Sequence, residues 1–272
     1  MPYRLLAMDM DGTVLNSKKN ITPRTEEAVH TAISAGKEVL FATGRCLSEM
    51  REHLARFPEM RYAICLSGAT VVDLQKGVTL SVAALPRELV EQIMALAHEF
   101  DVMVAVYAGN DVFLENRHRG KMEYYGCDCF EKLYGNCAVW VEEIGEAIAL
   151  RGGDVRKINF YFHSTEEWEQ GGRKLTGLPV SYARGIPNNY EISPLNVTKG
   201  VGLEALCRRI GIPITQAIAV GDEGNDLAMI ETAGLGVAMG NASQAVKDAA
   251  DEITADCDHD GVAEVIEKYL LP

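Results

Sequence analysis

The sequence of 272 residues lacks any apolar run near the roughly 18 residues that a helix needs to cross a membrane. Asp9 interrupts the first apolar run too early for a secretory signal, so we expect a cytoplasmic protein with no membrane partner. The seven cysteines include no Cys-x-x-Cys pair, and the cluster Cys127-Asp128-Cys129 lacks a second pair that would complete a zinc site. We therefore expect these cysteines to be reduced thiols, as is usual in the cytosol.

Basic residues are also scarce, because 26 lysines and arginines face 39 aspartates and glutamates, giving a net charge of −13. Proteins that bind nucleic acid generally need a clustered basic face, so we expect no nucleic-acid partner. The composition otherwise fits an ordinary globular protein, with 47% apolar and 24% charged residues. The acidity raises a question about any anionic ligand, which would need positive charge from another source.

Short apolar runs alternate with helical segments in the first and last thirds of the chain. Residues 5–8, 39–42 and 62–66 have the composition of buried strands, and a helix beginning at Thr22 and Pro23 separates the first two. The remaining predicted elements of these thirds are helix 47–57, hairpin 69–82, helix 198–210, strand 217–220, helix 227–233, strand 235–239 and helices 242–250 and 261–271. This alternation predicts an α/β fold, a Rossmann-like doubly wound parallel sheet with helices on both faces.

The middle of the chain departs from this pattern. It begins with a predicted helix at 88–100, and its clearest strands are 102–107 and 157–163. We therefore predict an inserted α+β module at residues 83–186, and a core built from residues 1–82 and 187–272.

Polar residues follow the predicted core strands at the points where those strands end. Asp9 to Thr13 follow the first strand, Thr43 to Arg45 follow the second, and Gly221 to Asp226 follow the strand at 217–220, while Lys199 opens the preceding helix. Ligands of open parallel sheets bind at the carboxyl ends of the strands. Each motif alone has a common structural explanation, such as a turn, a strand-to-helix connection or a solvated lysine. Their occurrence together at element ends favours a functional site.

The acidic residues of these motifs suit phosphoryl transfer. Asp9 and Asp11 are two positions apart and can project to the same side of an extended chain. An aspartate carboxylate can attack phosphorus to give an aspartyl-phosphate, while a second carboxylate handles protons. Together with Asp222 and Asp226 they make four acids that would repel one another, which suggests a bound Mg²⁺.

The other residues of the motifs supply donors and positive charge. A phosphoryl group needs both around its oxygens. Suitable groups are the Thr43 hydroxyl, the backbone N–H of Gly44, the Lys199 ammonium and the Asn225 amide.

The four motifs resemble those of haloacid dehalogenase (HAD) superfamily phosphatases, specifically the Cof-type branch with a large inserted cap, type IIB. The family's first motif, Asp-x-Asp-Gly-Thr, stands here as Asp9–Thr13, and its second is Thr43. Its third is Lys199, and its fourth, Gly-Asp-x-x-Asn-Asp, is Gly221–Asp226. The resemblance covers nearly the whole chain, including the stretch Glu191-Ile192-Ser193-Pro194 before the lysine.

The resemblance implies a role for each motif residue. Asp9 would be the nucleophile and a Mg²⁺ ligand. Asp11 would be the general acid and base, with its backbone carbonyl on the metal. Asp222 would complete the protein's metal ligands, and Asp226 would lie in or near the second shell around the metal. The phosphate would be held by Thr43, Gly44, Lys199, Asn225 and the backbone N–H of Met10.

The resemblance also implies a Mg²⁺-dependent phosphatase that hydrolyses phosphomonoesters of small metabolites, such as sugar phosphates, through an aspartyl-phosphate. The long separation of Thr43 from Lys199 places the insertion between the second and third motifs. That insertion would act as a cap that closes over the leaving group and sets substrate choice. A phosphomutase on the same scaffold and a non-catalytic metabolite-binding relative are the alternatives. Hydrolysis is favoured because the family branch is mostly hydrolytic, which is an analogy.

Some positions depart from the family pattern or bear on the substrate. Ser67 stands where many relatives carry Asn. Arg45, Asn188 and Asn189 are candidate substrate contacts, although an ordinary loop explains the two asparagines equally well. For the basic run at residues 117–121 we favour a solvated surface over a second anion contact.

Overall fold

The structure, a computed structural model, describes residues 2–272 and consists of two compact units. The first unit contains the chain up to Arg45, His53–Val82 and Thr198–Pro272. The second contains Cys46–Glu52 and Ala83–Val197. Each unit is built around its own sheet.

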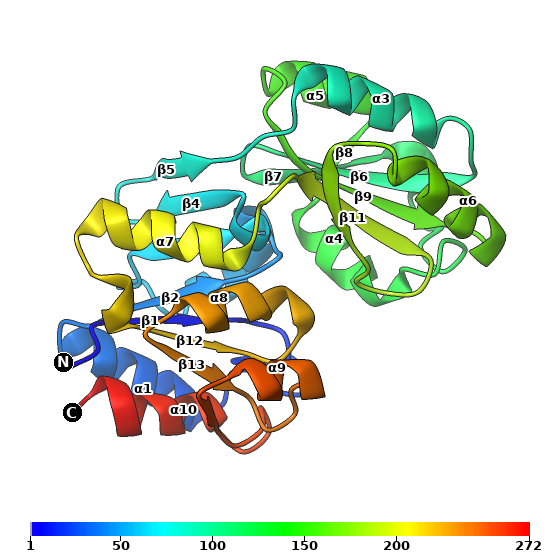
Figure 1. Ribbon diagram of the computed structural model, residues 1–272. Coiled ribbons are helices and arrows are strands. Elements are labelled where there is room, and N and C mark those ends of the chain that lie inside the picture. The colour runs from blue at the N-terminus through cyan, green and yellow to red at the C-terminus, as the bar shows by residue number, and fades with distance from the viewer. Residues whose placement is uncertain (1) are drawn as a thin grey trace. The chain divides into compact units, whose positions relative to one another are not determined.

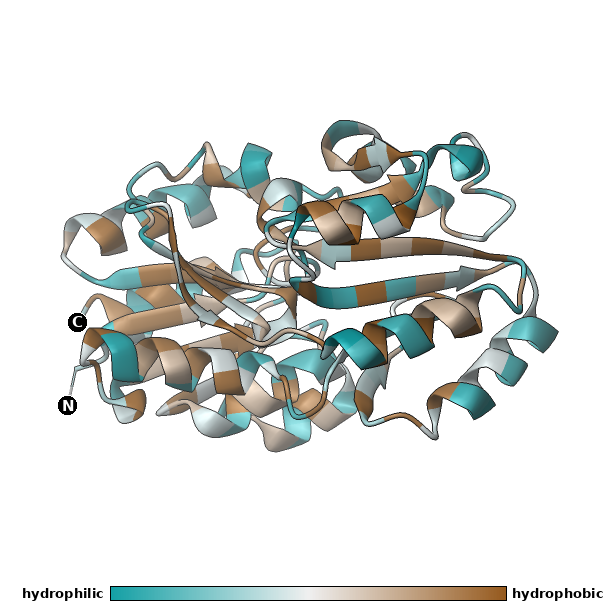
Figure 2. Cartoon of the chain, turned by 90° about the horizontal axis from the view of Figure 1, so that it is seen from above, coloured by the Kyte–Doolittle hydropathy of each residue, from teal (hydrophilic) through white to brown (hydrophobic). Residues whose placement is uncertain are grey.

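An eight-stranded sheet forms the centre of the first unit, in the order β14-β13-β12-β1-β2-β3-β4-β5. Its strands are β1 (Leu5–Met8), β2 (Glu38–Ala42), β3 (Tyr62–Cys65), β4 (Thr70–Asp73), β5 (Val78–Val82), β12 (Ala217–Gly221), β13 (Leu235–Ala238) and β14 (Glu252–Ile253). Neighbouring strands from β14 to β3 run parallel, and β4 and β5 add an antiparallel edge. Strands β1, β12 and β13 are buried along their whole length, which explains their uninterrupted apolar sequences. Figure 2 colours the chain by hydropathy and shows apolar residues, in brown, along several strands.

Helices cover both faces of this sheet (Figure 1). They are α1 (Pro23–Ser34), α7 (Lys199–Ile210), α8 (Leu227–Thr232), α9 (Gln244–Ala249) and α10 (Gly261–Val265), which continues into a π-helical turn at Ile266–Leu270. Helix α1 packs on α10 and β2, whereas α7 packs on α8 and on β3 to β5. The predicted doubly wound parallel core is confirmed.

The start of α7 is fixed by local sequence. The Thr198 hydroxyl caps the helix by accepting the backbone N–H of Val201 at 3.2 Å. Gly211 ends the helix in the left-handed conformation, with φ of 72°. Lys199 is therefore held at the first helical position.

Strand β1 lies at the point where the strand order reverses. The chain passes from β1 to its neighbour β2 and returns much later to β12 on the other side of β1. Such a reversal opens a crevice beyond the carboxyl ends of the strands. Asp9 and Asp222 follow the ends of β1 and β12, so both lie at the edge of the sheet where the strand order reverses.

The second unit has a six-stranded sheet in the order β10-β11-β9-β6-β7-β8, antiparallel except for the pair β7 and β8. Its elements are α3 (Arg87–Ala97), β6 (Val102–Ala108), β7 (Asp111–Glu115), α4 (Glu131–Cys137), β8 (Val139–Val141), α5 (Ile144–Leu150), β9 (Val155–Phe162), α6 (Thr165–Leu175), β10 (Val180–Ala183) and β11 (Asn189–Pro194). Apolar residues of α3, α5, β6 and β9 share one buried cluster, so the unit has its own core. Among residues 2–272, no helix combines the length and apolar character needed to span a membrane.

Two boundaries differ from the sequence predictions. The second unit ends at Val197 rather than at residue 186, because β11 pairs with both β9 and β10. The helix predicted at 47–57 is instead a 3-10 turn at Leu47–Met50 followed by one turn of helix, α2 (Arg51–Leu54). The 3-10 turn belongs to the second unit, where the Ser48 N–H donates to the Asn110 carbonyl at 3.1 Å.

Candidate active site

Asp9 lies directly beyond β1 and is buried, with 7% of its surface exposed. Its backbone N–H donates to the Val220 carbonyl at 3.0 Å, which extends the β1–β12 pairing to this residue. The chain then turns sharply at Gly12, where φ is +83°. A Cβ at Gly12 would lie 2.3 Å from Oδ2 of Asp222, so glycine is required by both backbone and space.

Asp226 is completely buried and organises the loop that follows β12. Its Oδ2 accepts the backbone N–H groups of Asp222 at 2.9 Å and Glu223 at 3.1 Å. A Cβ on Gly221 would lie 2.3 Å from Cγ of Asp226, so this approach also needs glycine. The carboxylate of Asp226 therefore fixes the conformation of this loop.

Lys199 joins the two loops. Its buried ammonium donates to Oδ1 of Asp9 at 2.5 Å and to Oδ1 of Asp226 at 2.7 Å. Burial alone would lower the pKa of Lys199, but the charges of Asp9 and Asp226 outweigh burial and raise it, so the ammonium stays charged. Burial raises the pKa of Asp9 to about 7 despite the charge of Lys199, and the negative charge of Asp226 adds to the rise.

Asp9, Asp222 and Asp226 form a buried acidic trio, in which one carboxylate oxygen from each residue lies within 4.8 Å of the other two. Burial raises the pKa of Asp222 to about 6, opposed by a hydrogen bond from the Thr13 hydroxyl to its Oδ1 at 2.8 Å. One ammonium cannot neutralise three carboxylates, so the trio retains negative charge when all are ionised. Such oxygen donors with uncompensated charge fit a hard divalent cation. Because Asp226 already accepts Lys199 and two N–H groups, Asp9 and Asp222 are the better placed ligands.

Asp11 is half-exposed and ion-paired. Arg45 donates two hydrogen bonds to its carboxylate, from Nε to Oδ2 at 2.9 Å and from Nη2 to Oδ1 at 2.8 Å. The Lys19 ammonium lies 2.9 Å from Oδ1. Burial raises the pKa of Asp11, but the charges and hydrogen bonds of Arg45 and Lys19 outweigh burial, and the pKa falls below its usual value. The geometry therefore gives Arg45 a partner within the protein, where the sequence suggested only a substrate contact.

The predicted phosphate-binding residues lie at the same edge of the sheet. Thr43 follows β2 and is buried, and its hydroxyl accepts the backbone N–H of Arg45 at 3.2 Å. Met10, next to Asp9, is fully buried, whereas Asn225 is exposed beside Asp226. Gly44 follows Thr43 directly in the same connection.

Asn188 and Asn189 lie in the second unit, where both are engaged in local structure. Asn189 is buried, its amide nitrogen donates to the Phe160 carbonyl at 3.0 Å, and its Oδ1 accepts the Gly185 N–H at 3.0 Å. Asn188 has a positive φ of 56° and its Oδ1 accepts the hydroxyl of Thr165 at 3.1 Å. The loop explanation accounts for both side chains, and their role toward a substrate stays a prediction.

Sequence reasoning missed three contributors to this site. Thr13 was identified only as part of a motif, yet its hydroxyl orients Asp222. Asn241 donates from its amide to the Gly12 carbonyl at 2.8 Å and to Oδ2 of Asp222 at 3.4 Å. Lys19 contacts Asp11 from the loop after β1. No spacing rule connects Asn241 or Lys19 to the aspartates, so only the folded chain reveals them.

The chain is similar to known hydrolases in sequence and in fold. Residues 6–266 match the family model described as haloacid dehalogenase-like hydrolase. The chain is 29% identical to the 5-amino-6-(5-phospho-D-ribitylamino)uracil phosphatase YcsE of Bacillus subtilis, over 98% of this chain and 96% of that protein. It is 26% identical to the HMP-PP phosphatase of Serratia proteamaculans, again over 98% and 96%. A solved haloacid dehalogenase-like hydrolase from Bacteroides thetaiotaomicron has a TM-score of 0.87 at 29% identity, covering 98% of this chain and 99% of that one.

Proposed function

Because the chain belongs to the haloacid dehalogenase-like hydrolase family, as its sequence motifs predicted, we propose that it is a Mg²⁺-dependent phosphatase acting through an aspartyl-phosphate. The names of its relatives agree with a phosphoric monoester hydrolase. The observation that carries the proposal is the buried cluster in which Lys199 holds Asp9 beside Asp222 and Asp226. This cluster combines a positioned carboxylate nucleophile, a fixed ammonium and an oxygen-rich cation site.

In the first step, a carboxylate oxygen of Asp9 attacks the phosphorus of the ester, and the bond from phosphorus to the ester oxygen breaks. Asp11, protonated at that moment, gives its proton to the departing oxygen, so an alcohol leaves and the aspartyl-phosphate remains on Asp9. In the second step, ionised Asp11 takes a proton from water, whose oxygen attacks the phosphorus. Inorganic phosphate leaves and Asp9 is regenerated.

The remaining residues position and stabilise the phosphoryl group. We assign the Lys199 ammonium, the Thr43 hydroxyl, the Asn225 amide and the backbone N–H groups of Met10 and Gly44 to the phosphoryl oxygens. A bound Mg²⁺ would be held by Asp9, Asp222 and the Asp11 carbonyl. It would supply the positive charge that lets an anionic ester approach the acidic trio.

In this scheme, the ion pairs of Asp11 would link the protonation of its carboxyl to substrate binding. Arg45 and Lys19 keep the Asp11 carboxyl ionised while no substrate is bound, because they lower its pKa. An incoming phosphate dianion competes for the same two cations. As Arg45 and Lys19 turn toward the phosphate, the pKa of Asp11 rises and the carboxyl can take up the proton that the first step consumes. Substrate binding would thus prepare the general acid.

We further propose that the substrates are small phosphorylated metabolites and that the second unit determines the choice among them. YcsE and the HMP-PP phosphatase are both named for small phosphorylated compounds, which supports this class without selecting a member. The net charge of −13 supports a partner that is a small molecule rather than a nucleic acid. We propose a cytoplasmic location on the same basis as the sequence prediction.

The test is hydrolysis of an aryl phosphate with Mg²⁺ present, comparing wild type with Asp9→Asn and with Asp248→Asn. Asp248 is an exposed residue of α9, so its variant controls for the loss of one carboxylate. We expect Asp9→Asn to abolish turnover and Asp248→Asn to retain it. Full activity of Asp9→Asn, or undiminished activity with Mg²⁺ removed by a chelator, would overturn the proposal.

A further inference from the structure

The chain directly after β3 adopts an unusual backbone conformation. Leu66, Ser67 and Gly68 have positive φ angles of 52°, 53° and 102°, and we call these three residues the left-handed turn. Two consecutive non-glycine residues in this region are rare, and a bulky residue such as leucine is an outlier there. Backbone strain of this kind persists only where the surrounding structure imposes it, and it is common at functional sites.

Three contacts hold the left-handed turn in place. The side chain of Leu66 is buried in the core, with 1% of the residue exposed. The backbone N–H of Leu66 donates to the Arg45 carbonyl at 3.0 Å, and that of Ser67 donates to the Thr43 carbonyl at 2.9 Å. These two carbonyls flank Gly44 in the chain. The turn is therefore bonded to both sides of the residue whose N–H we assigned to the phosphoryl group.

The bond to the Thr43 carbonyl fixes the direction of the Gly44 N–H. The two groups belong to one peptide unit, which is planar and places them on opposite sides of the chain. Glycine has no Cβ and restricts the rotation of the preceding peptide unit little, so this unit could otherwise turn over. While Ser67 holds the carbonyl, the N–H of Gly44 has to point the opposite way.

The left-handed turn also packs against the start of α7. A Cβ on Gly68 would lie 2.0 Å from the carbonyl oxygen of Thr198 and 3.2 Å from the backbone nitrogen of Lys199, so the contact requires glycine. Thr198 is the cap that holds Lys199 at the first helical position. One short segment thus contacts the supports of two groups that come from distant parts of the sequence.

We propose that the left-handed turn is a positioning element, which directs the Gly44 N–H and fixes the start of α7 for binding of a phosphoryl group. The proposal rests on the phosphatase function, which assigns Gly44 and Lys199 to the phosphoryl oxygens. If Ser67 relaxed to an ordinary negative φ, it would release the Thr43 carbonyl and the peptide unit could turn over. Ser67 acts here through its backbone, and its hydroxyl is not required.

The test measures the binding of inorganic phosphate to the full-length protein at saturating Mg²⁺ by isothermal titration calorimetry. Ser67→Val places a β-branched residue in the left-handed region, so we expect the turn to relax. The dissociation constant should then rise about tenfold, as expected for the loss of a hydrogen bond to a charged group. Ser67→Gly also removes the hydroxyl but tolerates a positive φ, so it should bind phosphate about as tightly as the wild type.

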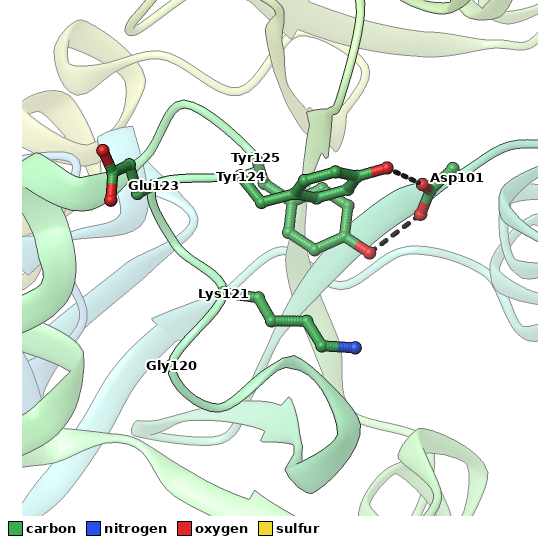
Figure 3. A pocket seen from close by; sticks show the side chains of 6 residues that line it. All are labelled: Asp101, Gly120, Lys121, Glu123, Tyr124 and Tyr125. Atoms are coloured by element: carbon green, nitrogen blue, oxygen red, sulfur yellow. Dashed lines mark hydrogen bonds between the residues drawn. The ribbon is translucent and has the colours of Figure 1, made fainter.

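A second variant tests the contact with α7. Gly68→Ala should weaken phosphate binding by a similar factor, because its Cβ would push the turn away from the Thr198 carbonyl. The matched control is Gly120→Ala, because Gly120 also has a positive φ, +73°, but no atom within 4 Å of a new Cβ. Figure 3 shows Gly120 in a loop of the second unit, beside an open pocket lined by Lys121 and Tyr124. This control should bind phosphate as the wild type does.

A further measurement does not depend on phosphate. In the ¹⁵N-labelled wild type, the Ser67 amide should exchange slowly with solvent, because it is bonded to the Thr43 carbonyl. In Ser67→Val, the Gly44 amide signal should shift or broaden as its peptide unit populates two orientations. A turn that only stabilises the fold would lower the melting temperature of Ser67→Val without changing the Gly44 signal or the affinity for phosphate.

The outcomes separate this proposal from the proposed function. Absence of phosphate binding by the wild type with Mg²⁺ would count against the function, whereas the exchange of the Ser67 amide would still test the turn. Rapid exchange of that amide in the wild type would overturn the proposal, and so would equal affinity in the wild type and folded Ser67→Val. Weak binding by Ser67→Gly would assign the effect to the hydroxyl and contradict a backbone role. If circular dichroism shows that Gly68→Ala does not fold, Ser67→Val and the amide exchange decide.

Discussion

Replacing Lys199 by Met should destabilise the protein strongly, because it removes the ammonium that contacts two buried carboxylates. The side chain of methionine has similar length and packs well, so the change tests the charge rather than the volume. Lys199 is fully buried and contacts Asp9 at 2.5 Å and Asp226 at 2.7 Å. Breaking a buried ion pair by removing one partner costs about 3–5 kcal/mol. For a chain of this size we expect the melting temperature to fall by roughly 10 °C.

The destabilisation should also depend on pH. The pKa of Asp9 is already raised to about 7, and loss of Lys199 raises it further. A carboxyl whose pKa is higher in the folded state binds its proton more tightly there, so stability falls as pH rises from the unfolded value of about 4 through the folded value. The loss caused by Lys199→Met should therefore be larger at pH 8 than at pH 5.

Urea unfolding followed by circular dichroism, with divalent ions chelated, measures this effect at both pH values. Lys76→Met is the matched control, because Lys76 is exposed in the turn between β4 and β5 and its replacement should change stability by less than about 0.5 kcal/mol. A loss below about 1 kcal/mol for Lys199→Met, equal at both pH values, would refute the argument that this ammonium stabilises two buried charges.

Three further predictions follow from the contacts of the site. Gly12→Ala should lose Mg²⁺-dependent hydrolysis, because the new Cβ would lie 2.3 Å from an oxygen of Asp222. Gly36→Ala is the control, because Gly36 has a similar φ of +78° but no atom within 4 Å of a new Cβ, and this variant should retain hydrolysis. Arg45→Gln should raise the pKa of Asp11, measured by NMR titration of the free protein, and an unchanged value would contradict the ion pair. Mg²⁺ at about 100 times its dissociation constant should raise the free energy of unfolding of the wild type by about 2.7 kcal/mol. Asp222→Asn should reduce this stabilisation at the same Mg²⁺ concentration. Equal stabilisation of the two proteins would exclude Asp222 as a ligand.

The convergence of the acidic residues could be predicted from the sequence because it depends on topology alone. Strands β1 and β12 are parallel neighbours, so whatever follows each of them lies at one edge of the sheet. Asp9 and Asp222 directly follow these strands, and the Thr198 cap fixes Lys199 at the start of α7. Short apolar runs and one helix cap are sufficient to locate such positions.

The partner of Asp11 could not be predicted in the same way. Arg45 and Lys19 reach Asp11 through long side chains, whose direction depends on rotamers and on the surrounding fold rather than on sequence spacing. The same limit applies to His118, for which the basic run suggested a solvated surface. The structure instead buries its imidazole against Tyr125, while its neighbour Arg119 stacks on Trp140 at 4.5 Å. A run of charged residues predicts a segment at the surface, but it does not predict which side chains point into the protein.

The end of the inserted unit was placed too early for a related reason. Residues 189–194 contain the alternation of a strand, but the predicted core began at residue 187 and therefore included them. Their pairing with β9 is non-local and antiparallel, joining Tyr190 to Phe160 and Ile192 to Ile158. The register of such a pairing depends on the partner strand as well, so the sequence of β11 alone does not predict it.

The question that the acidity raised about an anionic ligand also applies to the site itself, because the site is acidic. Asp9, Asp222 and Asp226 share one ammonium, so the buried cluster repels a phosphate ester unless another cation is present. In the resting protein Asp11 neutralises one of the two positive charges of Lys19 and Arg45, so these side chains offer an ester only one net positive charge. Under the proposed mechanism, the divalent cation must therefore bind before the ester or together with it. An ester that bound tightly with the cation chelated would show that Arg45 and Lys19 are sufficient, and the acidic trio would then need a different explanation.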